Sequence, residues 1–220
     1  LMAHLMRRAG FGASYEDLVE YCAKGYEATV EELLYPENSP DIEQDLVFRY
    51  RGGWTIHDTT VMNCCYWVYR MVNSKRPLEE KITLFWKGVL CTDSAKVDNE
   101  AVEWVNVEML RRNGMGSFRT LLMEVSKDPA MVFYLDNCMS HKGAINENYG
   151  RELLELFSLG VGMDGYANYT EDDVKACARA FTGWTRNNLI PQYPYGNYDW
   201  GFKYDPADHD DEEKTFLGET

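Results

Sequence analysis

The clearest fold signal in the chain is the stretch Thr170-Glu171-Asp172-Asp173-Val174-Lys175-Ala176-Cys177-Ala178-Arg179-Ala180-Phe181-Thr182-Gly183. Its apolar residues recur at i, i+3, i+4 and i+7, which is the spacing of one helix face: Val174, Cys177, Ala178 and Phe181. Thr170 is suited to cap the start of such a helix, and Gly183 is suited to end it. The stretch therefore predicts an amphipathic α-helix that packs one face against a core.

The same periodicity predicts further helices on the N-terminal side of this stretch. We expect them over residues 15–24, 27–35, 57–72, 77–89, 98–112, from 117 onward, 131–135 and 148–159. In the helix over 57–72, one apolar stripe predicts five buried side chains: Val61, Cys64, Cys65, Val68 and Val72.

The character of the sequence changes after Trp184. Tyr, Asn, Pro and Gly dominate from Thr185 to Trp200, which indicates a long loop, and Phe202 and Tyr204 then alternate as in a short strand. The expected fold is mainly α, a multi-helix orthogonal bundle with a loop-rich, short-stranded C-terminal segment. We expect a helical domain over residues 1–184 and a loop-rich segment over 185–220 that continues into a missing C-terminal half.

Charge and hydropathy exclude two classes of partner. The net charge of −14 over 220 residues argues against nucleic acid, because phosphates are bound by a basic surface. No apolar run approaches the ~20 residues of a membrane span, so no membrane insertion is expected. Residues 205–220 hold seven acids and one base, which is typical of a solvated loop or of a cation-binding loop.

The most polar helix face lies within residues 146–155. At 100° per residue, Asn148, Glu152 and Glu155 fall within about 60° of one another. Two carboxylates one turn apart can share a divalent metal, or can raise the pKa of one carboxyl for acid–base work. The alternative is an ion-pair ladder, because Glu147, Arg151 and Glu155 stand at successive i+4 steps.

Basic and imidazole side chains supply the other candidates. His209 lies between Asp208 and Asp210, and neighbouring acids suit a histidine that binds a metal or moves a proton; the alternative is a solvated loop histidine. Arg8 can clamp a carboxylate or phosphate, or can buttress Asp136 or a glutamate inside the fold. His4, His57 and His141 have no partner close in sequence.

Several longer strings occur in order along the chain. They are Ala3-His4-Leu5-Met6-Arg7-Arg8-Ala9-Gly10-Phe11-Gly12, Leu84-Phe85-Trp86, Asp128-Pro129-Ala130-Met131, Tyr134-Leu135-Asp136-Asn137, Asn146-Glu147-Asn148, Arg151-Glu152-Leu153, Glu155-Leu156-Phe157-Ser158-Leu159-Gly160-Val161-Gly162, Ala178-Arg179-Ala180-Phe181-Thr182-Gly183-Trp184, His209-Asp210 and Lys214-Thr215-Phe216-Leu217-Gly218. Together they resemble the N-terminal half of the bacterial domain-of-unknown-function family numbered 1800, over essentially the whole chain.

This resemblance supplies no established reaction. It implies a gene neighbour from a second uncharacterised family, numbered 1501, that is similar to exported sulfatases or phosphatases, and hence an exported or cell-envelope role. It also adds weight to six polar residues as functional: Asn148, Arg151, Glu152, Glu155, His209 and Asp210. Where many relatives carry two histidines after the Phe-Trp pair, this chain has Lys87 and Val89.

Two functional hypotheses follow. The first is a metal-assisted enzyme, hydrolytic or oxidative, that acts outside the cytoplasm with a divalent metal as its cofactor. Its catalytic candidates are Glu152, Glu155 and His209, its binding candidates are Arg8, Asn148, Arg151 and Asp136, and its metal ligands are Glu152, Glu155, His209 and Asp210. The alternative is a non-catalytic binding or assembly module for a protein of the family numbered 1501, with an aromatic surface made by Tyr193, Tyr195, Tyr198 and Trp200.

Overall fold

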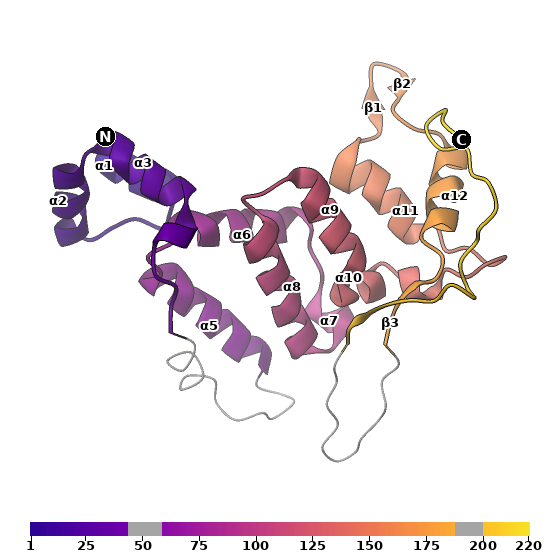
Figure 1. Ribbon diagram of the computed structural model, residues 1–220, viewed down its shortest axis with the longest axis horizontal. Coiled ribbons are helices and arrows are strands. Elements are labelled where there is room, and N and C mark those ends of the chain that lie inside the picture. Colours follow the sequence, from indigo (N-terminus) through magenta and orange to yellow (C-terminus); the bar gives the residue numbers. More distant parts are fainter. Residues whose placement is uncertain (44–58, 188–199) are drawn as a thin grey trace, which may run out of the picture. The chain divides into compact units, whose positions relative to one another are not determined.

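The computed structural model describes residues 1–43, 59–187 and 200–220, with side chains omitted at 59–62. The described chain is mainly helical and has two small two-stranded sheets near its C-terminus (Figure 1), which confirms the predicted fold class. Its helices are α1 (Met2–Arg8), α2 (Tyr15–Lys24), α3 (Tyr26–Leu34), η1 (Pro36–Asn38), α5 (Thr59–Asn73), α6 (Pro77–Val89), α7 (Ser94–Val97), α8 (Glu100–Asn113), α9 (Phe118–Lys127), α10 (Pro129–Tyr134), η2 (Asn137–Met139), α11 (Asn148–Glu152), η3 (Leu153–Ser158) and α12 (Glu171–Ala180).

The strands form two separate antiparallel pairs. In the first pair, β1 (Gly162–Met163) lies beside β2 (Tyr166–Ala167). In the second, β3 (Trp184–Arg186) pairs with β4 (Phe202–Tyr204), so the strand predicted from Phe202 and Tyr204 is confirmed. Within the described ranges, no helix combines the length and the apolar character that a membrane crossing requires.

The chain divides into two compact units. The first contains Leu1–Gly88 and Leu110–Gly116, and the second contains Val89–Met109 and Ser117–Thr220. The predicted division between residues 184 and 185 falls within the second unit and stays a prediction.

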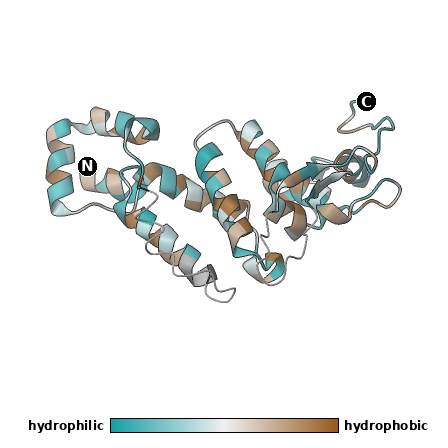
Figure 2. Ribbon diagram, turned by 60° about the horizontal axis from the view of Figure 1, so that its bottom comes forward, coloured by the Kyte–Doolittle hydropathy of each residue, from teal (hydrophilic) through white to brown (hydrophobic). Residues whose placement is uncertain are grey.

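Two helix starts show why these residues form helices. Ser14 and Thr170 each accept a hydrogen bond from a backbone N–H three residues on, and the Asp17 and Asp173 carboxylates accept one from the backbone N–H of the cap residue. These capping boxes satisfy donors that a helix start otherwise leaves free. The longer helices carry both hydrophilic and hydrophobic positions (Figure 2), as amphipathic packing requires.

In the first unit a buried ionic cluster is centred on Glu80. Its carboxylate accepts hydrogen bonds from Arg70 Nε at 2.7 Å, Arg111 Nε at 2.9 Å and Trp67 Nε1 at 3.1 Å. Arg70 also donates to Asp41 at 2.6 Å. The interior of this unit is therefore held by charge pairs. In each pair, the attraction between the two charges offsets the free-energy cost of removing them from water.

Arg70 explains why the predicted stripe of α5 is wrong. The buried side chains of this helix include Tyr66 and Arg70, whereas Cys64, Cys65, Val68 and Val72 are exposed; Val61 falls where side chains are not described. The helix turns toward Glu80 because an uncompensated buried carboxylate would cost more free energy than leaving these smaller apolar side chains in water.

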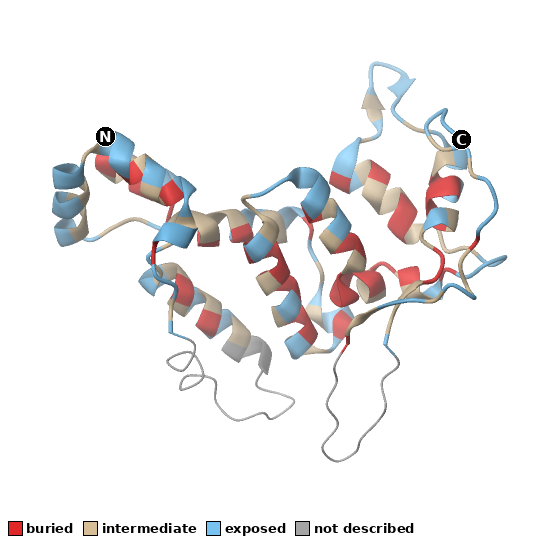
Figure 3. Ribbon diagram, viewed as in Figure 1, coloured by how far each residue is buried: buried red, intermediate tan, exposed pale blue. Residues whose placement is uncertain are grey.

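In the second unit α11 and α12 pack closely together. Gly150 lies so near to α12 that a Cβ atom there would be 3.1 Å from the backbone nitrogen of Ala178. Leu154 of η3 forms a buried cluster with Val174 and Cys177 of α12, and burial raises the pKa of the Cys177 thiol to about 12. Buried residues of α12 are red in Figure 3, so the predicted apolar face of this helix is confirmed.

Candidate functional site

The candidate site lies where the segment after β4 crosses the end of α12. We call this segment, residues 205–214, the crossing segment. Gly183 has a φ of 76°, and a Cβ there would lie 2.4 Å from the carbonyl oxygen of Asp205 and 3.3 Å from the Cα of His209. Only glycine permits both the left-handed backbone and this close approach. The backbone N–H of Asp205 donates to the Gly183 carbonyl at 2.7 Å, which fixes the crossing segment in place.

His209 is held at the crossing by backbone oxygen. Its Nδ1 lies 2.8 Å from the carbonyl oxygen of Thr182. A carbonyl can only accept, so Nδ1 carries the proton and, in the neutral ring, Nε2 keeps the lone pair. The Tyr204 ring packs edge-on against the imidazole at 5.6 Å. His209 is thus oriented as a base or a ligand would be.

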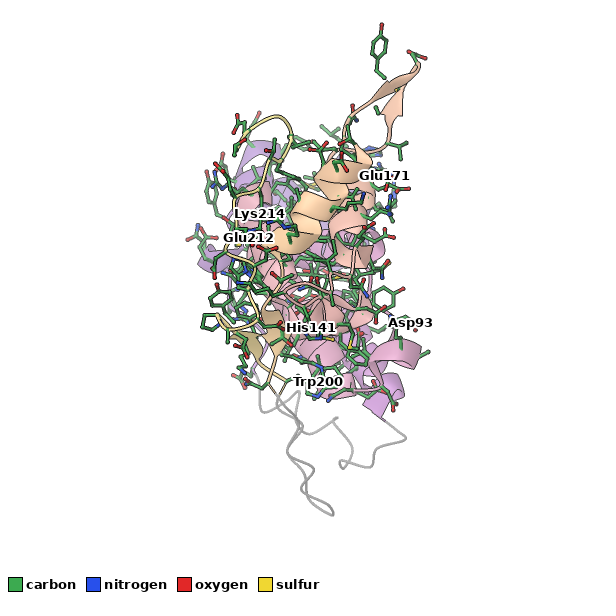
Figure 4. All side chains as sticks on the ribbon, turned by 90° about the vertical axis from the view of Figure 1, so that its right-hand side faces the viewer. Asp93, His141, Glu171, Trp200, Glu212 and Lys214 are labelled. Carbon is green, nitrogen blue, oxygen red and sulfur yellow. The ribbon has the colours of Figure 1, made fainter. Side chains whose placement is uncertain are left out.

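Asp210 anchors the same segment to α12. Its carboxylate accepts hydrogen bonds from Arg179 Nε at 2.7 Å and Nη2 at 3.2 Å, while its N–H donates to Thr182 Oγ1 at 2.8 Å. Hydrogen bonding to Arg179 lowers the pKa of Asp210 to about 2. Lys214 binds the Asp210 carbonyl oxygen, and Figure 4 shows Glu212 and Lys214 beside α12. A metal ion at this carboxylate would have to displace the guanidinium.

A second imidazole stands next to this segment. His141 Nδ1 lies 2.5 Å from Asp208 Oδ2, and Lys142 donates its N–H to the Asp208 carbonyl at 3.2 Å. Both side chains of the His141–Asp208 pair are more than a third exposed. No sequence pattern indicates this pair, because its members are 67 residues apart and neither lies in a motif. An imidazole oriented by a carboxylate is a recurring acid–base arrangement.

The predicted glutamate face has a different geometry from the one assumed. After Glu152 the chain continues as the π-helical turn η3, in which Leu159 donates to the Leu154 carbonyl at 3.0 Å. A π-helical turn holds more residues than an α-helical turn, so each residue advances by less than about 100° and Glu155 rotates away from Glu152. Glu155 accepts a hydrogen bond from Tyr169 at 3.3 Å. Glu152 is half-buried, and its carboxylate has no hydrogen-bond partner among the described residues.

The binding candidates mostly have structural partners. Arg151 pairs with Glu147 at 3.2 Å, as the ladder predicted, but its second partner is Glu171 at 2.7 Å rather than Glu155. Asn148 Nδ2 donates to the Leu135 carbonyl at 3.3 Å.

The remaining two binding candidates lie in different units. Asp136, at a φ of 57°, pairs with Lys96 at 2.9 Å. Arg8 is exposed at the end of α1 in the other unit.

The four predicted metal ligands therefore separate into two places. Glu152 and Glu155 lie on α11 and η3, while His209 and Asp210 lie on the segment that crosses α12. Throughout residues 1–43, 59–187 and 200–220, no three His, Cys, Asp or Glu side chains gather in a way that could hold a metal ion. A metal site on the four residues stays a prediction. Tyr193, Tyr195 and Tyr198 lie outside the described residues, and Trp200 is buried rather than exposed.

Comparison with known proteins places the whole of this chain in one family. No curated protein and no solved structure matches it. A family model described as "Protein of unknown function (DUF1800)" matches residues 4–220, which include α11, α12, the crossing segment and both oriented histidines. The chain belongs to that family of proteins of unknown function, DUF1800.

Proposed function

We propose that this chain carries part of the active site of a hydrolytic enzyme, in which His209 transfers the proton. The observation that carries the proposal is the 2.8 Å contact of His209 Nδ1 with the Thr182 carbonyl, which leaves Nε2 as the acceptor. Imidazole is the side chain that gains and loses a proton near neutral pH, and a fixed tautomer is what a general base requires.

The surroundings of His209 support this role. Arg179 and Asp210 hold the backbone beside it, and Gly183 permits the close crossing, so the imidazole is built into a supported segment. The neighbouring His141–Asp208 pair offers a second proton carrier within the same loop cluster. Hydrolysis needs one group to activate water and another to protonate the leaving group, and two oriented imidazoles suit that division.

Generic chromogenic substrates test the reaction class. We expect the purified protein to hydrolyse at least one of p-nitrophenyl acetate, phosphate or sulfate, and His209→Gln to lower kcat/KM about a hundredfold or more. His4→Gln is the matched control, because His4 is an exposed histidine on α1. Turnover of none of the three esters, or equal rates in wild type and His209→Gln, would contradict the proposal.

The predicted divalent metal belongs to the same proposal and has its own measurement. Elemental analysis of the purified protein, before and after Glu152→Ala, tests whether metal is bound and whether this glutamate holds it. Stoichiometric metal that disappears in the variant would place the cofactor on α11.

A substrate outside the cytoplasm and a partner from the family numbered 1501 also remain proposals, supported by the sequence resemblance. Co-elution of the two purified proteins in gel filtration tests the partner, and separate elution contradicts it.

A further inference from the structure

A group of apolar side chains is exposed on the hairpin β1–β2 and on the turn that precedes it. We call this group the hairpin patch. The exposed fractions of its members are 64% for Leu156, 42% for Leu159, 61% for Val161, 81% for Met163 and 81% for Tyr166. Single apolar residues are common on protein surfaces, whereas several large ones exposed within one short segment are typical of an interaction site.

The hairpin is built as a rigid element. Asp164 and Gly165 both have positive φ, 55° and 84°, as a tight two-residue hairpin turn requires. Gly162 has a φ of 98°, and a Cβ there would lie 1.9 Å from the Tyr166 carbonyl oxygen, so the strands approach as only glycine allows. Met163 faces Tyr166 across the pair. The backbone that carries the two most exposed side chains of the patch is therefore well defined.

The base of the hairpin is tied to the π-helical turn. Asn168 Nδ2 donates to the carbonyl of Leu159 at 2.8 Å and to that of Gly160 at 3.1 Å. Figures 1 and 4 both show the hairpin projecting beyond α11 and α12. A backbone that is ordered before binding loses less conformational entropy when a partner covers it. The exposed side chains thus project from an ordered backbone.

Charge indicates what kind of partner fits. Residues 151–175 contain six acids and two bases: Glu152, Glu155, Asp164, Glu171, Asp172 and Asp173 against Arg151 and Lys175. Asp164 lies at the turn itself and is exposed, and the Asp172 side chain is 94% exposed. We propose that the hairpin patch docks into an apolar groove of a partner protein whose rim carries Lys and Arg.

Two other occupants fit the charges less well. A second copy of this chain would bring two acidic rims together, and like charges facing each other cost free energy. An anionic membrane surface would repel the same carboxylates. The proposal is independent of the His209 chemistry, since no member of the hairpin patch lies in the candidate site.

Site-specific photo-cross-linking in the producing cells tests the proposal. Benzoylphenylalanine replaces Met163 in the full-length protein, and the cross-linked protein is identified by mass spectrometry, purified and titrated against wild type. Met139 is the matched control position, because it is 60% exposed, lies in the same unit and is outside the hairpin patch. We expect one partner protein that cross-links from position 163 and not from position 139.

Two variants then separate the apolar and the ionic contributions. Met163→Ser/Tyr166→Ser is expected to weaken binding about tenfold or more, as truncated anchor side chains do. Asp164→Lys/Asp172→Lys is expected to slow association and to remove most of its salt dependence. All four positions are exposed, and circular dichroism checks that both variants fold.

Several outcomes overturn the proposal. They are cross-links to a second copy, to lipid or within the same chain, equal cross-linking from position 139, and unchanged affinity in both variants.

Discussion

The two histidines near the candidate site, His209 and His141, are each held through their own Nδ1 atom. Nδ1 of His209 faces the Thr182 carbonyl and Nδ1 of His141 faces Asp208, so each neutral ring keeps its lone pair on Nε2. This arrangement needs no metal or distant charge to set the tautomer, because a carbonyl and a carboxylate both only accept. Proton transfer at either ring then depends on how well these oxygens stay in place.

The pairing of Arg179 with Asp210 makes a prediction about pH. Arg179 lowers the pKa of Asp210 from 3.8 to about 2, so the unfolded chain binds more protons between these values. The contribution of Asp210 to stability is therefore fully present above about pH 4 and is lost as pH falls toward 2. We expect Arg179→Met to lower the free energy of unfolding at pH 6, and this difference from wild type to shrink as pH falls through that window.

Lys175→Met is the control for this measurement, because Lys175 lies on the same helix and pairs with the exposed Asp172 at 3.5 Å. Urea unfolding at several pH values gives the curves. A wild-type minus Arg179→Met difference that stays constant from pH 6 to pH 2 would argue against the linkage.

Gly183 makes a second prediction at the residue scale. Gly183→Ala places a methyl group 2.4 Å from the Asp205 carbonyl and strains a φ of 76°. Gly160 has a similar φ of 74° but nothing within 4 Å of its added Cβ. We expect Gly160→Ala to cost about 1 kcal/mol for the backbone alone, and Gly183→Ala to cost about 3 kcal/mol. Equal losses of unfolding free energy in chemical denaturation would mean that the crossing segment can shift to make room for the methyl group without cost.

At the element scale, the π-helical turn decides which polar residues share a face. The sequence predicts one regular helix over residues 148–159, and helical residues do fill that range except for the last, Leu159. The Leu154 carbonyl, however, accepts from both Leu159 and Gly160, and the wider turn moves Glu155 toward Tyr169. Apolar periodicity predicts that a helix is present but does not show where a π-helical turn adds a residue. The helix was therefore predictable here, and the relative orientation of Glu152 and Glu155 was not.

Other elements also divide into those that the sequence predicts and those that it does not. Helices α2, α6 and α12 were predictable from their apolar spacing, and Ser14 and Thr170 also mark the starts of α2 and α12 as caps. The buried face of α5 was not predictable. Arg70 can be assigned to the core only once its partner Glu80 is known. The hairpin β1–β2 carried a recognisable Asp164-Gly165 turn signal, but its strands are too short for an alternating pattern.

The capping box of α12 supplies a prediction for this element. Thr170 Oγ1 accepts from the Asp173 N–H at 3.2 Å, and Asp173 also receives the Leu217 N–H at 2.6 Å. We expect Thr170→Ala to lower the free energy of unfolding by about 1 kcal/mol, because one helix donor loses its acceptor. Asp173→Ala should cost more, since it frees Leu217 as well as the cap. Thermal and urea unfolding measure both, and an equal loss in the two variants would show that the Leu217 contact adds no stability.

At the scale of the whole molecule, the candidate site depends on contacts that no local pattern contains. His141 and Asp208, and Arg179 and Asp210, come together only because the segment after β4 crosses the end of α12. The string from Ala178 to Trp184 and the pair His209-Asp210 were visible in the sequence, yet their neighbourhood was not. Long-range pairing is set by tertiary packing, and single-sequence reasoning about spacing cannot supply it.

The net charge of −14 makes a prediction for the molecule as a whole. Excess carboxylates repel one another more strongly in the compact state than in the expanded chain, so screening should favour folding. We expect the Tm at pH 8 to rise by a few degrees when potassium chloride increases from about 20 mM to about 300 mM, as the Debye length shortens. Near the sequence pI of 4.7 the repulsion is small, and the same salt step should leave the Tm almost unchanged. A Tm that falls with salt at pH 8 would mean that attractive pairs such as Arg151 with Glu171 outweigh the net repulsion.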